Sequence, residues 1–448
     1  MKKIILFAIL LQAFGVFAQD KKERYEFTLK QAIEHALQYN YSAINANRDI
    51  ETAKKKKWET TTMGLPQING NVGYQNNFVF TRQGVSGNAF NPSGDPNSVT
   101  TIAFGTKHIM NSGITLSQLI FDGSYLVGLQ SAKTYLKISE NSKIKTNQEI
   151  KEIVINFYGN VLLAYESVLI LEKNKAILEK TVSDTREVYK NGFIEEENVE
   201  QLQLTLSAVK SALEYSNRMK IISANMLKLV LGIDIEKSLI LTDTLNTLTQ
   251  NNFDLNILKE EFNVSNAIDY QIGQNIEESK KLLLKLEKSK ALPSLGAAFN
   301  FGYNSFANQF SFVENNQKWN NFSNLGVSLN VPIFSSLGRS SRTQQAKIEV
   351  EQSKTKLKET EQKLKLQFES AKSEYEFSLD QYTTAKNNLS LAERIENKQQ
   401  IKFREGLSSS FDFAEAQKQL YTKQQDYLKS MVEIINKKAA LEKIITKI

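Results

Sequence analysis

Few residues of this chain have side chains that commonly do chemistry. The 448-residue sequence contains two histidines, His35 and His108, and no cysteine. Neither histidine has further ligands at the spacing of a metal site, and thiolate ligands and disulfides are excluded. The sequence also lacks a glycine-rich phosphate loop and a serine nucleophile motif. We therefore expect no enzymatic activity and no cofactor, and we interpret His108 as a core or lumen-facing strand residue.

One pair of carboxylates has a spacing that could serve a function. Asp412 and Glu415 are three residues apart near the start of a predicted helix, so that both lie on one face of it. Carboxylates also favour a helix N-terminus, because they interact well with its dipole. The pair by itself is therefore compatible with a helix-stabilising role as well as with a functional one.

The elements around this pair occur twice in the chain. A helical pattern stops at Gly406 and resumes near Phe411, after serines that are good N-cap residues. Gly192 lies in the same context, and its residue number is lower by 214. The chain therefore contains two copies of one helical hairpin. Without any gap, the offset aligns Gln203 with Gln417, Leu206 with Leu420 and Ser216 with Ser430.

Long helices lead to each hairpin tip. Helical patterns run from about residue 124 to 190 and again up to residue 403. Within them, mostly apolar residues are spaced alternately four and three apart over 150–171 and 364–392, the heptad pattern of coiled coils. Such helices measure roughly 100 Å, and none of the five prolines interrupts them. Each hairpin is predicted to be an antiparallel coiled coil. The seams are Ile150, Val154, Phe157, Val161, Ala164, Val168 and Leu171, and Leu364, Phe368, Ala371, Tyr375, Ser378, Tyr382, Ala385, Leu389 and Ala392.

The first residues have the pattern of a secretory signal. Lys2 and Lys3 precede an apolar run, and Val16 and Ala18 are the small residues before a predicted cleavage after Ala18. An N-terminal anchor helix is the alternative. No run of 18 or more apolar residues follows, so no transmembrane helix is predicted. The net charge of +7 is modest, and because basic and acidic residues are interleaved, we do not expect nucleic-acid binding.

Each hairpin follows two segments whose hydrophobic period is 2 instead of 3.6. We predict strands at residues 66–81, 98–121, 293–304 and 319–334, each with one apolar and one polar face. In a secreted protein such strands favour an outer-membrane barrel over a soluble β subdomain. Because a membrane barrel needs about eight strands, two or three chains must contribute to one. The long helices would project from the bilayer, which is only about 30 Å thick.

These patterns predict a mainly α-helical chain with a two-fold internal repeat. We divide it into a signal peptide (1–18), a first structural repeat (19–231), a connector (232–255) and a second structural repeat (256–448). Each repeat consists of a helix, two strands and a helical hairpin, with the hairpin tips near residues 192 and 406.

This repeated order resembles that of the TolC-like outer-membrane efflux and secretion channels. The resemblance covers nearly the whole mature chain, and it depends more on the repeated order than on any single motif. The similar segments are Leu29–Ala36, the Leu-Pro junctions at Pro66 and Pro293, the strand exits Gly113–Phe121 and Gly326–Phe334, and the tip segment Gly406–Ala416.

The resemblance implies a homotrimer in the outer membrane of a Gram-negative bacterium. Three chains would share a twelve-stranded β-barrel, and twelve hairpin helices would form an α-barrel tunnel in the periplasm. The channel would be the exit duct of a tripartite efflux or type I secretion system, with an inner-membrane transporter and a periplasmic adaptor protein as partners. The sequence does not distinguish drugs, metal ions and polypeptides as the cargo.

The resemblance also implies roles for the tip residues. Asp412 and Glu415 would form two acidic rings at a periplasmic gate, and rings of carboxylates select cations. Gly192 with Phe193, and Gly406 with Leu407, would present apolar tips to the adaptor. Ordinary helix stops with a hydrophobic cap contact are the alternative for these tips.

Two features depart from the family pattern. Asn198 and Gln201 replace Asp412 and Glu415 in the first hairpin, so we expect only one acidic tip in each chain. Ser408 stands where family members often have a basic residue that holds neighbouring helices together. The sequence therefore does not identify the residue that would hold the gate shut. A periplasmic coiled-coil adaptor or scaffold that forms no pore is the alternative function, although adaptors usually have one hairpin rather than two.

Overall fold

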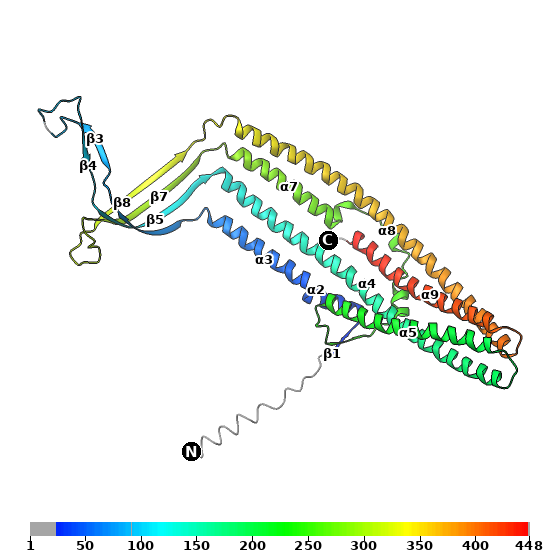
Figure 1. The fold of residues 1–448 in the computed structure, drawn as a ribbon. Coiled ribbons are helices and arrows are strands. Elements are labelled where there is room, and N and C mark those ends of the chain that lie inside the picture. The colour runs from blue at the N-terminus through cyan, green and yellow to red at the C-terminus, as the bar shows by residue number, and fades with distance from the viewer. Residues whose placement is uncertain (1–23, 91, 447–448) are drawn as a thin grey trace, which may run out of the picture. The chain divides into compact units, whose positions relative to one another are not determined.

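The computed structural model describes residues 24–90 and 92–446 of the chain, so the predicted signal peptide lies outside the described residues. The chain forms two compact units (Figure 1). The helical unit comprises residues up to 50, 139–274 and from 356 onward, and the sheet unit comprises residues 51–138 and 275–355. The long helices α4 and α8 contribute residues to both units.

Most described residues are helical, as predicted. The helices are α2 (Leu29–Tyr39), α3 (Tyr41–Thr62), α4 (Gly123–Lys190), α5 (Glu196–Leu231), α6 (Leu245–Asn251), α7 (Ile268–Ser289), α8 (Gly338–Arg404) and α9 (Ser410–Ile445). Helices α4 and α8 end 214 residues apart, and α5 and α9 begin and end 214 residues apart. The two hairpins, α4–α5 and α8–α9, therefore match residue for residue.

The first predicted seam lies in the core of the helical unit. Ile150, Val154 and Val161 of α4 are buried together with Val432 and Ile435 of α9. Near the tips, residues of α4, α5 and α9 form a separate cluster that includes Leu178, Leu202 and Phe413. Farther from the tip, the α4 seam thus shares one cluster with α9 and with Leu227 and Leu231 at the end of α5.

Two helices differ from the predicted pattern. The first helix is interrupted at Asn40, which is extended and donates its side-chain amide to the Val230 carbonyl at 2.7 Å. The predicted helix from residue 256 begins only at Ile268, because residues 257–266 form two short 3-10 turns. Within them Ile257 packs on α8 and α9, and tertiary packing of this kind overrides helical propensity.

The sheet unit contains a four-stranded antiparallel sheet in the order β2-β5-β7-β8 (Figure 1). Its strands are β2 (Gln67–Asn76), β5 (His108–Asp122), β7 (Ser294–Ala307) and β8 (Asn320–Asn330), while β3 (Arg82–Ser86) pairs with β4 (Val99–Ala103) separately. The strand predicted at 98–121 is therefore two strands. Gly105, with a φ of 119°, lies in the break between them.

The strand register separates a polar face of the sheet from an apolar one. Directly paired residues share a face, and one row across the sheet is Asn69, Thr115, Asn300 and Asn324. Thr115 donates to Asn300 at 2.7 Å, and Asn300 donates to Asn324 at 2.9 Å. The adjacent row, on the opposite face, is Ile68, Leu116, Phe299 and Leu325.

His108 lies on the apolar face rather than on the polar one. It is buried, and its ring nitrogen Nδ1 is 2.9 Å from the Tyr74 hydroxyl of the paired strand. A group of aromatic rings from the β7–β8 loop, including Phe310, packs around Tyr74 and His108. The interpretation of His108 as a core residue is therefore confirmed.

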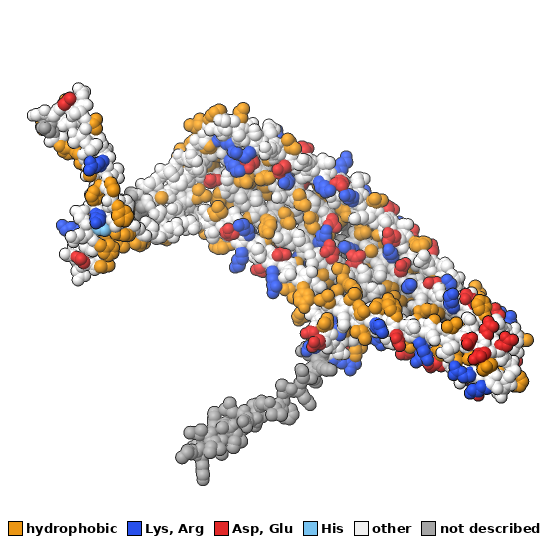
Figure 2. Space-filling model, viewed as in Figure 1, with side chains coloured by type: hydrophobic (Ala, Val, Ile, Leu, Met, Phe, Trp, Pro, Cys, Tyr) orange, Lys and Arg blue, Asp and Glu red, His pale blue; other side chains and the backbone are white. Residues whose placement is uncertain are grey.

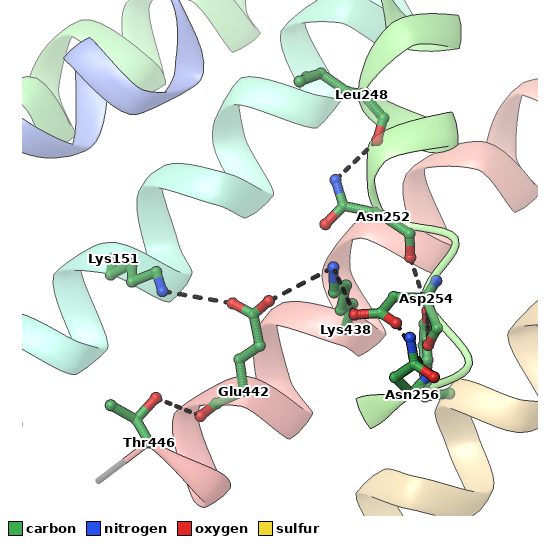
Figure 3. A network of polar contacts seen from close by, with 9 residues as sticks. Lys151, Leu248, Asn252, Asp254, Asn256, Lys438, Glu442 and Thr446 are labelled. Carbon is green, nitrogen blue, oxygen red and sulfur yellow. Dashed lines mark hydrogen bonds and ion pairs between the residues drawn. The ribbon is translucent and has the colours of Figure 1, made fainter. Parts of the chain in front are cut away.

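The connector carries β6 (Ser238–Leu241), which pairs with β1 (Arg24–Phe27), and it is bound to α8 and α9 by polar contacts. The Tyr375 hydroxyl of α8 donates to the Asn252 carbonyl at 2.7 Å and accepts from the Asp254 N–H at 2.9 Å. The ammonium of Lys438, largely buried on α9, lies 3.8 Å from Asp254 and 3.7 Å from Glu442 (Figure 3). These contacts fix the irregular chain after α6.

One described helix, α4, contains an 18-residue window that is long and apolar enough to cross a membrane. Half of this window is buried inside the protein, and a core helix passes the same test. Polar residues interrupt this window, so it is not one of the uninterrupted apolar runs on which the prediction of no transmembrane helix depends.

Candidate functional site

Both hairpin tips are built on a glycine with a left-handed backbone. The φ angles of Gly192 and Gly406 are 79° and 72°, a region that residues with a Cβ rarely adopt. After the second tip glycine, Leu407 donates its N–H to the Lys402 carbonyl at 2.8 Å. After the first tip glycine, Phe193 donates its N–H to the Val188 carbonyl at 3.2 Å. This is the Schellman arrangement that ends many helices.

The residue after each tip glycine is exposed. In a Schellman motif this residue often packs back onto its helix, but Phe193 is 80% exposed and Leu407 is 77% exposed. The helix stops are therefore present, whereas the hydrophobic cap contact is largely missing. Figure 2 shows hydrophobic side chains among acidic ones at the tip end of the helical unit.

Asp412 caps the helix that follows the second tip. Ser409, the N-cap of α9, accepts from the Asp412 N–H at 3.1 Å, and its hydroxyl donates to the Asp412 carboxylate at 2.7 Å. The hydrogen bond from the Ser409 side chain is the largest cause that lowers the pKa of Asp412. The carboxylate is exposed and anionic at neutral pH, so it retains its charge while it caps the helix.

Glu415 lies one turn farther along α9, in a different environment. Its carboxylate is 3.8 Å from the Lys418 ammonium and accepts from the Gln419 amide at 3.4 Å. It lines a groove of about 390 Å³ between α5 and α9, together with apolar residues such as Leu204 and Tyr421. The two predicted gate residues thus share a helix face but have different partners.

Ser408 bonds to its own hairpin. Its hydroxyl donates to the Gln399 side chain of α8 at 2.9 Å and lies 3.4 Å from the Asp412 carboxylate. Below it, the Gln417 amide of α9 donates to the Glu396 carboxylate of α8. Burial is the main cause that raises the pKa of Glu396. Sequence reasoning missed Glu396, because a single carboxylate in a charged helix gives no signal of burial.

The first tip lacks the cap but carries other carboxylates. Its N-cap, Glu195, makes no side-chain cap hydrogen bond, and Asn198 donates to the Glu195 carbonyl at 3.3 Å. Glu195, Glu196, Glu197 and Glu200 are all exposed. The expectation of only one acidic tip in each chain is therefore wrong. The run of glutamates was visible in the sequence, but it lies outside the positions that match Asp412 and Glu415.

Similarity to known proteins covers both halves of the chain. A model of the outer membrane efflux protein family matches residues 283–446. Outer membrane protein TolC of Vibrio cholerae is 21% identical over 241 residues, which are 53% of this chain and 54% of that protein. The alignment thus spans about half the length of this curated relative.

Several solved structures share the fold over nearly the whole chain. The Campylobacter jejuni CmeC outer membrane channel has a TM-score of 0.72 at 18% identity, and the alignment covers 93% of this chain and 85% of that one. The open state of the Neisseria gonorrhoeae MtrE outer membrane channel has a TM-score of 0.68 at 15% identity, with coverages of 93% and 88%. Residues 283–446 thus match the outer membrane efflux protein family, and the described chain has the fold of these outer membrane channels.

Proposed function

We propose that the protein is an outer-membrane channel that serves as the exit duct of a tripartite efflux or type I secretion system. The observation that carries this proposal is the four-stranded sheet with one polar and one apolar face. On the apolar face Ile68 and Leu325 are 71% and 70% exposed. Lipid would cover this face, and the polar face would line an aqueous lumen. An apolar face of this kind argues against a pore-free periplasmic adaptor.

The edges of the sheet support an oligomer. Strands β2 and β8 are the two edge strands of the sheet. Within a bilayer their free N–H and C=O groups must find partners, and only a closed barrel supplies them. In a homotrimer, β8 of one copy would pair with β2 of the next, and three sheets would close a twelve-stranded barrel. The long hairpins would then form the periplasmic tunnel.

The tips would dock a periplasmic adaptor protein, which joins the channel to an inner-membrane transporter. The exposed side chains of Phe193 and Leu407 support this role. A groove of about 690 Å³ between α4 and α5, lined by Tyr189 and Leu204 among others, lies beside the first tip. The division into repeats at residues 19–231 and 256–448 belongs to the same proposal, with the connector between them.

The carboxylates at the second tip would form the periplasmic gate. Three copies of Asp412 and Glu415 would surround the lumen as acidic rings, which favour cations. The lowered pKa of Asp412 supports a persistent negative charge there.

A test of the channel function uses outer-membrane fractions of cells that express the full chain. We expect a heat-modifiable trimer that amine crosslinkers capture. Val327→Asp, which places a charge on the apolar sheet face where Val327 is 65% exposed, should reduce assembly. Asn324→Asp on the polar face is the matched control and should assemble normally. A monomer in the soluble fraction would contradict the proposal.

A further inference from the structure

Within one chain, α4 of the first hairpin contacts α9 of the second, and near the tips α5 also packs on α9. Lys443 of α9 lies 2.9 Å from Glu152 of α4. Nearer the tips, the Ser167 hydroxyl of α4 donates to the Gln425 side chain of α9 at 3.3 Å. These polar pairs accompany the apolar cluster that α4 and α9 share.

The 214-residue repeat relates this contact to a second one. In the repeat, α8 is the equivalent of α4, and α5 is the equivalent of α9, because each of these pairs of helices ends 214 residues apart. In a closed ring of three chains, the second hairpin of one copy must meet the first hairpin of the next through a heterologous contact. If the six hairpins are evenly spaced, α8 of one copy lies beside α5 of its neighbour as α4 lies beside α9.

The residues at the equivalent positions are apolar and uncovered. Leu366 of α8 replaces Glu152, and Leu229 of α5 replaces Lys443. Leu366 is 71% exposed and Leu229 is 58% exposed in the single chain. By contrast, the side chains of the ion pair Lys443 and Glu152 are 31% and 26% exposed. The ion pair within the chain thus corresponds to two leucines that have no apolar cover within the helical unit.

One neighbouring pair of positions also fits a contact between copies. Gln381 replaces Ser167 and Ser211 replaces Gln425, so the same two residue types occur there in exchanged places. A second ion pair of α4 and α9, Lys151 with Glu442 at 3.4 Å, corresponds instead to two lysines, Lys365 and Lys228. Lys365 pairs with Glu361 of its own helix at 2.6 Å, and Lys228 donates to the carbonyl of Ile235 at 2.8 Å. Both lysines therefore have partners in their own chain.

We propose that Leu366 of one copy packs against Leu229 of the next, so that an apolar contact joins the copies where an ion pair joins the hairpins within a chain. This inference rests on the homotrimer of the proposed function and names the residues of its helical interface. Burial of the two leucines would favour association, because it removes a large apolar area from water.

Cysteine pairing tests the contact directly, because the chain has no cysteine of its own. Leu229→Cys and Leu366→Cys are placed on separate chains that carry different tags and are expressed together. A disulfide-linked dimer that contains both tags is expected after mild oxidation, and each single variant alone should give none. In the double variant, covalent trimers should replace the monomer on a denaturing gel.

A charge exchange provides the second test. Leu366→Glu should weaken the trimer, and Leu366→Glu with Leu229→Lys should restore it by recreating the Glu152–Lys443 pair between copies. Leu169→Glu is the matched control, because Leu169 of α4 is also 58% exposed but lies away from this contact. Amine crosslinking of the same samples reports the trimer independently. A trimer without the cysteine link would overturn the Leu366–Leu229 contact alone, whereas no trimer at all would overturn the proposed function with it.

Discussion

Ser409 and Asp412 cap α9 reciprocally: the Ser409 hydroxyl donates to the Asp412 carboxylate at 2.7 Å and accepts from the Asp412 N–H at 3.1 Å. The same carboxylate is exposed at the tip of the second hairpin. Capping therefore leaves the carboxylate of Asp412 exposed, as the proposed gate role requires. A substitution there changes the helix cap and the surface charge, and experiments must separate these two effects.

The first prediction concerns ion selectivity. Asp412→Asn with Glu415→Gln should lower the preference for cations, because it removes both acidic rings while an amide oxygen still accepts the cap hydrogen bond. The measurement is the reversal potential in a planar bilayer under a salt gradient. Asn198→Asp with Gln201→Glu is the converse variant, and it should raise the preference. An unchanged reversal potential in both variants would show that carboxylates at the positions of Asp412 and Glu415 do not set selectivity.

The second prediction concerns the pH dependence of the cap. Because the pKa of Asp412 is lowered in the folded state, its contribution to stability is complete above its ordinary value near 3.8. This contribution is lost as the pH falls through the lower folded-state pKa. The wild type should therefore unfold at a higher urea concentration than Ser409→Ala at pH 6, and the difference should shrink below pH 3.8. A difference that is constant with pH would speak against the charged cap.

The third prediction concerns Glu396, whose ionisation should change stability with pH in the opposite direction to that of Asp412. Burial raises its pKa, so ionisation costs stability, and stability falls as the pH rises from below the ordinary value of 4.5 through the folded-state pKa. Glu396→Gln keeps an acceptor for Gln417 without the buried charge. We expect the variant to melt at a higher temperature than the wild type at pH 7 and at a similar temperature below pH 4.5. Glu393→Gln, at an exposed site on α8, serves as control. A melting temperature of Glu396→Gln below that of the wild type at pH 7 would refute the burial argument.

The fourth prediction concerns the connector. Tyr375→Phe removes a hydroxyl that bonds both Asn252 and Asp254 and leaves a polar backbone group without its partner. The expected loss in the free energy of unfolding is about 1–3 kcal/mol. Tyr215→Phe, at a site that is 64% exposed, should change it by less than about 0.5 kcal/mol. Equal effects of the two substitutions in urea titrations would mean that the hydroxyl does not fix the connector.

The fifth prediction concerns the tips. Gly406→Ala should cost about 1 kcal/mol, because alanine is strained at a φ of 72° even though its Cβ would meet no neighbour within 4 Å. Gly192→Ala should cost a similar amount. Gly338→Ala is the matched control, because that site is equally open but has no left-handed backbone. Thermal unfolding in detergent measures all three, and a neutral Gly406→Ala would contradict the tip geometry.

Local patterns predicted much of this fold, and long-range contacts account for the rest. The glycines at 192 and 406 end their helices by local geometry, so their spacing in the sequence was sufficient to find both tips. The break at Asn40 depends on the Val230 carbonyl, which is 190 residues away, and no periodicity records such a contact. The burial of Glu396 likewise depends on α9. The first-tip glutamates lie outside the two positions that match Asp412 and Glu415, so the internal repeat does not point to them.

The most direct test of the proposed function is the single-channel conductance of the purified full chain in a planar lipid bilayer. If three sheets close one barrel, trimer fractions should give discrete conductance steps, and fractions dissociated by heat should give none. A stable trimer without conductance, or conductance from a monomer, would contradict the proposal that the chain forms a shared outer-membrane channel.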